Sequence, residues 1–121
     1  LDSREYPWGA GMDWDKCRNG NNTGNGTTCG VWEYPLGCSP FGHYQMSGNV
    51  WEWCADWYDG NAYGRYKRGD LDRRLRATVV FCGAARGLFS EGYFRCALRY
   101  NNDPTDRDLS YGFRCARTIA L

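Results

Sequence analysis

The sequence predicts an α+β domain that is rich in loops and has little regular secondary structure. Sixteen Gly residues among 121 indicate many turns. Leu, Ile, Val and Phe together make up only 18 residues, so long apolar strands and helices are scarce. Six Trp and nine Tyr residues supply the missing apolar area, and a net charge of +1 argues against disorder. We therefore expect one domain, because this length suffices for one core and not for two.

The charge balance excludes several partners. Fifteen Lys and Arg residues stand against 14 Asp and Glu residues, which gives no basic surface for nucleic acid or an anionic membrane. No apolar run approaches the length of a membrane-spanning helix. The sequence therefore predicts neither nucleic acid nor a membrane as a partner.

Seven Cys residues leave the redox state open. Three disulfides and one free thiol would suit a secreted chain, whereas reduced, mostly buried thiols would suit a reducing cytoplasm. The chain has one His and no Cys-x-x-Cys pair, which argues against a structural zinc site. We favour reduced thiols and with them a cytoplasmic location, although composition does not determine the compartment.

Residues 40–58 carry three of the six Trp residues, with acidic residues between them. Rings of this size gain free energy mainly by burial, so a fully solvated loop is not expected here. Gly48-Asn49 predicts a tight turn that leads into a strand over residues 50–54. Side chains alternate along such a strand and divide into two sets: Val50, Glu52 and Cys54 on one side, and Trp51 and Trp53 on the other.

Four blocks of sequence follow one another along the chain: Tyr6-Pro7-Trp8-Gly9, then Phe41-Gly42-x-Tyr44-x-Met46-Ser47-Gly48-Asn49-Val50-Trp51-Glu52-Trp53, then Arg95-Cys96-Ala97-Leu98-Arg99, and finally Gly112-Phe113-Arg114-Cys115-Ala116. Together they resemble the signature motifs of the formylglycine-generating enzyme (sulfatase-modifying factor) family. The resemblance implies a C-type-lectin-like fold with short antiparallel strands. In that family the first block falls in mid-domain, so residues 1–121 are expected to be a single, partial domain from a longer protein.

The resemblance also implies a calcium site within the second block. Its matching oxygen ligands here are the side chain of Gln45, the backbone carbonyls of Gly48 and Val50, and the carboxylate of Glu52. The family usually has Asp or Asn at the position of Gln45, and Gln is longer and uncharged. The alternative is that Glu52 is a carboxylate held by Arg99 or Arg114, and the same residue could serve both purposes.

The oxidases of this family use two catalytic cysteines, a soft ligand pair suited to Cu(I), about five and ten residues before the position that matches Cys96. Those positions hold Glu91 and Arg86 here, and neither has a thiol. Cys82 is the nearest thiol and is only a weak catalytic candidate, because it has no partner within its segment. Copper would be required only if the chain were such an oxidase.

A polar loop over residues 101–111 separates two expected strands, residues 95–100 and 112–117. Its Asn, Asp, Ser and Tyr content resembles the ligand-binding surface of lectin-fold proteins that bacterial retroelements diversify. The predicted ligand is a protein, a peptide or a glycan. The candidate ligand-binding residues are Tyr93, Tyr100, Asn101, Asn102 and Tyr111.

Two further segments, residues 10–30 and 59–75, are predicted to be polar surface loops. An alternative for the first is that its carbonyls, with Asp13 or Asp15, bind a hard cation.

Three functions remain open on the sequence alone. A non-catalytic ligand-binding or accessory member of the family, with a surface diversified by a retroelement as one form of it, is favoured because the cysteine pair is not matched. The alternatives are an oxidase that converts a sulfatase cysteine to formylglycine, and the C-terminal part of a related sulfoxide synthase. The sequence therefore leaves open whether the chain is an enzyme.

Overall fold

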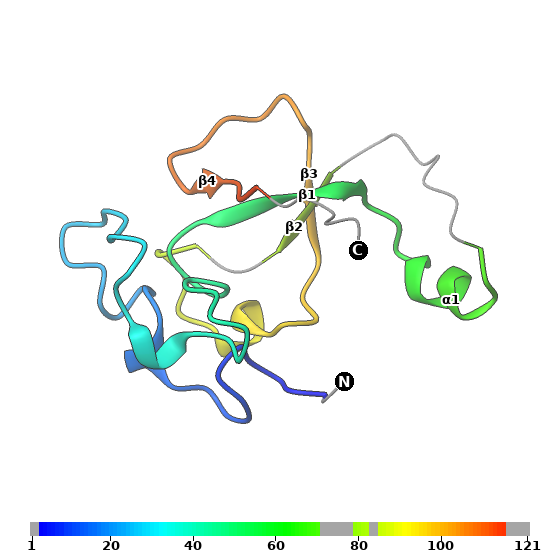
Figure 1. Cartoon of the computed structure of the whole chain (residues 1–121). Coiled ribbons are helices and arrows are strands. Elements are labelled where there is room, and N and C mark those ends of the chain that lie inside the picture. Colours follow the sequence, from blue (N-terminus) through cyan, green and yellow to red (C-terminus); the bar gives the residue numbers. More distant parts are fainter. Residues whose placement is uncertain (1–2, 71–78, 83–84, 116–121) are drawn as a thin grey trace.

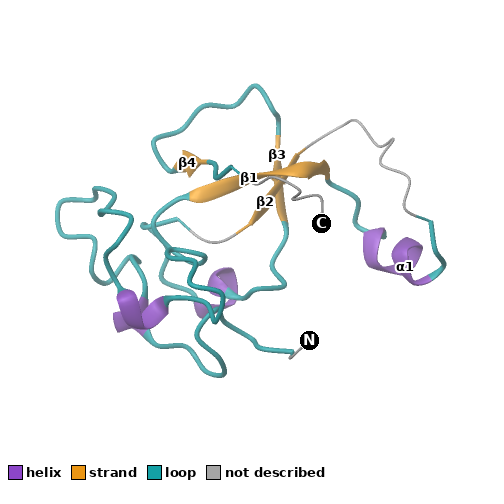
Figure 2. Ribbon diagram, in the orientation of Figure 1, coloured by secondary structure: helices purple, strands orange, loops and turns teal. Residues whose placement is uncertain are grey.

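The computed structural model of the chain describes residues 3–70, 79–82 and 85–115. Short elements are joined by long loops (Figure 1, Figure 2), which confirms the prediction of a loop-rich chain with little regular structure. In chain order, with η for a 3-10 helix, the elements are η1 (Trp14–Lys16), η2 (Pro35–Gly37), β1 (Trp51–Trp57), α1 (Ala62–Lys67), β2 (Val79–Cys82), η3 (Glu91–Phe94), β3 (Tyr100–Asn102) and β4 (Tyr111–Gly112).

The four strands form one mixed sheet in the order β3-β2-β1-β4. β2 pairs antiparallel with both β1 and β3, whereas β1 pairs in parallel with β4. The expectation of antiparallel strands is therefore right for two pairs and wrong for the third. The parallel pair forms because the long loop after β3 returns the chain to the start of β1, where Trp51 lies beside Tyr111 (Figure 1).

β1 lies between β2 and β4 and is the longest of the described strands. The predicted turn precedes it: Gly48 and Asn49 have φ angles of 93° and 68°. The strand extends to Trp57 instead of ending at residue 54. Its register against β2 shifts after Trp53, and pairing resumes where Trp57 lies beside Val79.

β2 has no counterpart among the strands expected from the sequence. The run Val79-Val80-Phe81-Cys82 is apolar and rich in β-branched residues, which is typical of a strand with neighbours on both edges. It lies between β1 and β3 in the sheet. Residues 76–78 and 83–84, which belong to the same segment, lie outside the described part of the chain.

The strand expected over residues 95–100 begins only at its last residue. The Cys96 N–H donates to the Glu5 carbonyl, with an N···O distance of 2.8 Å. The Leu98 N–H donates to the Arg95 carbonyl at 3.0 Å and closes a turn. The N–H groups of Cys96 and Leu98 are therefore hydrogen-bonded in a loop contact and in a turn, and they do not pair with a neighbouring strand.

Two other expected elements also need correction. The strand expected over residues 112–117 is the short β4, which ends at Gly112, and residues 116–117 lie outside the described part. The segment expected to be a polar loop, residues 59–75, contains α1, whose first N–H donates to the Asp59 carbonyl at 3.0 Å. No helix in the described ranges is long and apolar enough to cross a membrane.

The most buried side chains belong to the loops and to η3. Tyr6, Cys17 and Phe94 are at most 1% exposed and form the core. The hydroxyl of buried Ser47 donates to the Phe94 carbonyl at 2.7 Å, which connects the second sequence block to this core. Partly buried hydrophobic side chains pack around it: Trp8, Met12, Trp14 and Leu88.

Side chains that bind the main chain fix the course of residues 18–28. The fully buried Asn19 amide donates to the Trp14 carbonyl at 2.7 Å. The predicted long loop is thus confirmed apart from η1, but it is not wholly a surface loop, because Cys17 and Asn19 within it are fully buried. The Arg18 guanidinium donates to the carbonyl oxygens of Asn22, Thr23 and Thr27, at 2.5, 2.7 and 3.0 Å.

One of the two carboxylates proposed as cation ligands in this loop, that of Asp13, already has partners. Asp13 accepts from the Asp15 N–H at 3.1 Å and pairs with Lys16 at 3.5 Å. The Trp14 carbonyl accepts from Asn19. The contacts therefore favour an internally bonded loop over a cation site at Asp13 or Asp15.

Candidate ligand-binding site

Aromatic side chains gather on one side of the sheet near the start of β1. The Trp51 ring stacks on the Tyr100 ring, with centroids 5.7 Å apart and planes 24° apart. It meets the Tyr93 ring edge-on at 6.2 Å. Both geometries are favoured between aromatic rings. Tyr93 and Tyr100 are 39% and 51% exposed, so the cluster is open to solvent.

A second contact extends this surface along the sheet. The Trp53 ring meets the Tyr111 ring edge-on at 5.7 Å, and the Asn102 amide donates to the Tyr111 hydroxyl at 2.6 Å. The loop between β3 and β4 borders the pair and forms an open hollow of about 800 Å³ whose wall includes Trp53 and Tyr111. We name the whole surface the aromatic face; it consists of Trp51, Trp53, Tyr93, Tyr100, Asn102 and Tyr111.

Four of the five predicted ligand-binding residues lie in the aromatic face. Asn101 is the exception, because it alternates with Tyr100 and Asn102 along β3 and therefore points to the opposite side of the sheet. Trp51 and Trp53 were not predicted as binding residues, since burial explained their presence in the sequence. The alternation that puts both rings on one side of β1 was the signal that could have identified them.

Glu52 lies on the other side of β1 and is held by Arg114. The two carboxylate oxygens accept from Arg114 Nε at 2.6 Å and Nη2 at 2.5 Å. The same guanidinium donates to the Tyr44 and Gln45 carbonyls at 3.1 Å. Of the two predicted arginine partners Arg114 is thus confirmed, whereas Arg99 binds the carbonyl oxygens of its own turn.

The oxygen set that the resemblance implies for calcium is only partly open. Gln45 Oε1 is buried and has no hydrogen-bond partner among the described residues, as expected of an atom that could bind a cation. The Gly48 carbonyl, however, accepts from the Val50 N–H at 2.9 Å, and both Glu52 oxygens face Arg114. A cation would have to displace a guanidinium from its own carboxylate. The residues as arranged therefore do not fit calcium, and a titration with calcium would test the site that the resemblance implies.

Asn49 ties together three segments that lie far apart in the sequence. Its side-chain amide pairs with the backbone of Cys29, accepting at 3.0 Å and donating at 3.3 Å. Its backbone N–H donates to the Arg18 carbonyl, and its carbonyl accepts from the Arg86 N–H, both at 3.0 Å. These bonds explain why the turn before β1 needs a short amide side chain that tolerates a positive φ.

The two positions that match the catalytic cysteines of the oxidases have other roles here. The Arg86 guanidinium donates to the Gly26 carbonyl and, at 2.9 Å, to the Leu109 carbonyl. Glu91 is exposed at the start of η3. Cys82 ends β2, and its side chain lies outside the described part. Arg86 thus joins two loops at a position where an oxidase needs a thiolate.

The side chains of six of the seven cysteines, all except Cys82, are described, and none of these six forms a disulfide. Most were expected to be buried, but only Cys17 is, while Cys96 and Cys115 are exposed. Burial raises the pKa of the Cys17 thiol to about 11, against a smaller lowering by a hydrogen bond from Asn19. Burial and the nearby Glu33 also raise the pKa of Cys29.

A small mixed sheet within long loops, with the four sequence blocks in order, defines a domain of the formylglycine-generating-enzyme class. Residues 1–119 match the "Sulfatase-modifying factor enzyme 1-like domain", so the chain belongs to the sulfatase-modifying factor family. It is 35% identical over 116 residues to serine/threonine-protein kinase pkn1 of Chlamydia pneumoniae, covering 94% of this chain and 18% of the kinase. It is 30% identical over 142 residues to the formylglycine-generating enzyme of Thermomonospora curvata, covering 96% of this chain and 44% of the enzyme.

Solved structures show the same fold. Treponema denticola variable protein 1 matches with a TM-score of 0.66 and 21% identity, over 92% of this chain and 40% of that chain. PvdO from Pseudomonas aeruginosa also matches with a TM-score of 0.66, at 26% identity, over 90% of this chain and 42% of that one. The chain thus spans less than half the length of each of these relatives.

Proposed function

We propose that this chain is a non-catalytic ligand-binding or accessory member of its family, and that the aromatic face is its binding surface. The observation that carries the proposal is the half-exposed set of rings on one side of the sheet, with Tyr100 and Tyr93 around Trp51. Rings left this open gain little from folding, yet they would gain free energy by stacking on a ligand.

The chemistry of the face suits a protein, a peptide or a glycan. Trp and Tyr are the residues most enriched where binding energy concentrates. Tyr and Asn combine flat apolar area with hydrogen-bonding groups at a small entropic cost. The adjoining hollow adds the charged residues Asp106, Arg107 and Asp108 as polar contacts. The more specific form of the proposal is that a retroelement diversifies this surface. A surface of this composition would tolerate such diversification.

Two alternatives stay open, with less support. An oxidase that makes formylglycine with Cu(I) would need a thiol pair, but Arg86 and Glu91 stand at the matching positions. The C-terminal part of a sulfoxide synthase would use the chain only to shape a substrate pocket. Because the chain spans 18% of the kinase relative and 44% of the enzyme relative, an accessory module within a longer protein is the simpler form of the proposal.

A peptide assay separates the binding module from the oxidase. The chain would be incubated with Cu(I) and a Cys-x-Pro-x-Arg peptide, the substrate motif of the family's oxidases, and followed by mass spectrometry. We expect no formylglycine product. Turnover that disappears in Cys82→Ser would refute the non-catalytic assignment and would restore the oxidase.

Ligand capture tests the surface itself. The chain would be applied to arrays of immobilised glycans and peptides, alongside Tyr100→Ala and, as a matched control, Phe41→Ala. Phe41 is an exposed ring outside the aromatic face. We expect binding that Tyr100→Ala reduces about tenfold or more and Phe41→Ala leaves unchanged. Equal loss in both variants, or binding insensitive to both, would exclude the aromatic face as the site.

A further inference from the structure

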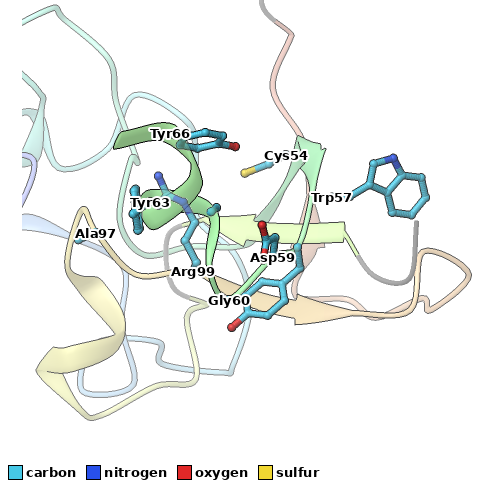
Figure 3. Close-up of a pocket in the computed structure, with 10 residues that line it drawn as sticks. Cys54, Trp57, Asp59, Gly60, Tyr63, Tyr66, Ala97 and Arg99 are labelled. Carbon is cyan, nitrogen blue, oxygen red and sulfur yellow. The ribbon is translucent and has the colours of Figure 1, made fainter. Parts of the chain in front are cut away.

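A separate cavity of about 350 Å³ lies where β1 ends and α1 begins (Figure 3). Four aromatic residues contribute to its wall: Trp57 at the end of β1, Tyr58 in the following turn, and Tyr63 and Tyr66 on α1. The opposite wall comes from a segment far away in the sequence, residues 97–99, through Ala97 and Arg99. In Figure 3 the Arg99 side chain extends toward the tyrosines of α1.

Of the two charged residues that line this cavity in the described part of the chain, Asp59 is paired and Arg99 is not. Asp59 accepts from Arg65 Nε at 2.5 Å and from the Asn61 N–H at 2.8 Å, which holds the pKa of its carboxyl below the ordinary value. Arg65 also lies 3.5 Å from Asp70. Within the described ranges Arg99 forms no ion pair; it donates only from Nη1, to the Cys96 and Leu98 carbonyls. The cavity therefore combines aromatic walls with an unneutralised guanidinium.

The cavity does not belong to the aromatic face. Its wall includes none of the six residues of the aromatic face, and within β1 the wall residue Cys54 follows Trp53, so alternation directs these two side chains to opposite sides of the sheet. Its residues also lie apart from the positions that match the catalytic cysteines and from the predicted calcium ligands. Neither the family membership nor the proposed function accounts for this cavity.

We propose that this cavity is a second binding site and that it takes a small aromatic carboxylate. A guanidinium with free N–H groups is matched in geometry to a carboxylate, which it can hold through two parallel hydrogen bonds. The ring of the ligand would lie against Tyr63 and Tyr66, where offset and edge-on contacts are available. A volume of about 350 Å³ lies at the small end of the range for ligand pockets, which suits a single-ring compound.

The test compares two probes of nearly equal shape that differ in charge. The carboxylate is 4-hydroxyphenylacetate, and its neutral counterpart is 4-hydroxyphenylacetamide. Titration at pH 7, followed by NMR chemical shifts and calorimetry, should give a Kd for the carboxylate on the order of 0.1–1 mM. We expect the amide to bind about tenfold more weakly. Equal affinity for the two probes, or no binding of either below about 10 mM, would overturn the proposal.

Variants assign the charge preference to one residue. Arg99→Gln should abolish the preference for the carboxylate, and Arg99→Lys should retain part of it, since the charge remains. Arg68→Gln is a matched control that should keep the preference, because Arg68 is an exposed arginine at the end of α1 and does not line the cavity. If Arg99→Gln does not fold, Tyr63→Ala replaces it and should weaken both probes alike. A charge preference that survives in folded Arg99→Gln would show that the carboxylate binds elsewhere.

Discussion

The loop-rich part of the chain, residues 3–49, contains fully buried side chains as well as exposed ones, whereas the side chains of the aromatic face are all at least partly exposed. In the loops even the polar Asn19 is fully buried, and Tyr6 is 1% exposed. On the sheet Tyr100 is half exposed although it stacks on Trp51. The comparison teaches that the fully buried core of the described residues lies outside the sheet, while rings on the sheet such as Tyr100 stay open to solvent. Substitutions in the two regions should accordingly differ in what they damage.

The largest expected effect comes from adding one methyl group at the turn before β1. In Gly48→Ala the new Cβ would lie 2.5 Å from the Arg18 carbonyl oxygen and 3.0 Å from Cys17 Cβ, at a φ of 93°. Both the steric clash and the positive φ are unfavourable for Ala, so we expect the unfolding free energy to fall by about 3–4 kcal/mol, or the variant to fail to fold. Urea unfolding followed by Trp fluorescence measures it.

Gly26→Ala separates the two causes. Gly26 also has a positive φ, 75°, but a Cβ there meets no atom within 4 Å. We expect the unfolding free energy to fall by only about 1 kcal/mol, because the positive φ is the single unfavourable factor at this position. Equal losses in the two variants would show that close packing around Gly48 is not the source of the effect.

The second-largest expected effect is a fall in the unfolding free energy at alkaline pH that depends on Cys17. Its pKa is about 11 in the folded chain against an ordinary 9.0, so folding favours the neutral thiol. This contribution is complete below pH 9 and is lost as the pH rises through 11; it amounts to about 2–3 kcal/mol. The difference in unfolding free energy between wild type and Cys17→Ala should shrink by this amount between pH 9 and 11.

Alkylation provides an independent check of that burial. Iodoacetamide at pH 8 should modify Cys96 and Cys115 in the folded chain and reach Cys17 only in urea, as peptide mapping would show. Rapid modification of Cys17 without urea would contradict the predicted burial. So would a difference in unfolding free energy between wild type and Cys17→Ala that does not change with pH.

A smaller effect is expected at the ion pair that anchors the back of β1. Glu52→Gln removes a charge-assisted, two-bond contact with Arg114, whose side chain is 37% exposed, so the expected loss is about 1–2 kcal/mol. Calorimetry of both proteins with and without millimolar calcium tests the implied metal site as well. We expect no calcium effect on the melting temperature. An increase in wild type that Glu52→Gln abolishes would show that calcium displaces Arg114.

The smallest effect on stability should come from the aromatic face. Tyr100→Ala removes a half-exposed ring, so the unfolding free energy should fall by about 1 kcal/mol or less while ligand binding falls sharply. Asn101→Ala is the control on the same strand, directed to the opposite side of the sheet. A large loss of stability in Tyr100→Ala would mean that this ring is part of the packing and not reserved for a ligand.

The features predicted correctly from the sequence depend on short-range rules. Gly48-Asn49 identifies a turn because these two residues tolerate a positive φ, and the strand after it follows from alternation. The composition of the region from β3 to β4 also pointed to Tyr100, Asn102 and Tyr111, which the structure brings together in the aromatic face, while their role in binding stays a prediction. Residues that follow a turn or a strand period can therefore be placed from the sequence alone.

The features missed depend on partners distant in the sequence. Nothing near Asn19 shows that its amide is fully buried, because its acceptors are main-chain carbonyls that only the folded loop positions. Residues 95–99 alternate as a strand would, yet Cys96 bonds to Glu5, some ninety residues earlier in the chain. The six-residue helix α1 contains Gly64 and has no side-chain cap, so it lacks the usual signals of a helix.

The two arginines that fix the loops have a consequence for how this fold tolerates change. Within the described part of the chain, the guanidinium groups of Arg18 and Arg86 donate only to main-chain carbonyl oxygens, those of residues 22, 23, 26, 27 and 109. Every amino acid carries that oxygen, so the arginines hold the path of the backbone without requiring particular side chains at the acceptor positions. The backbone can therefore keep its path when the side chains at the acceptor positions change. Substitutions at those positions would alter the surface of the domain without altering its fold.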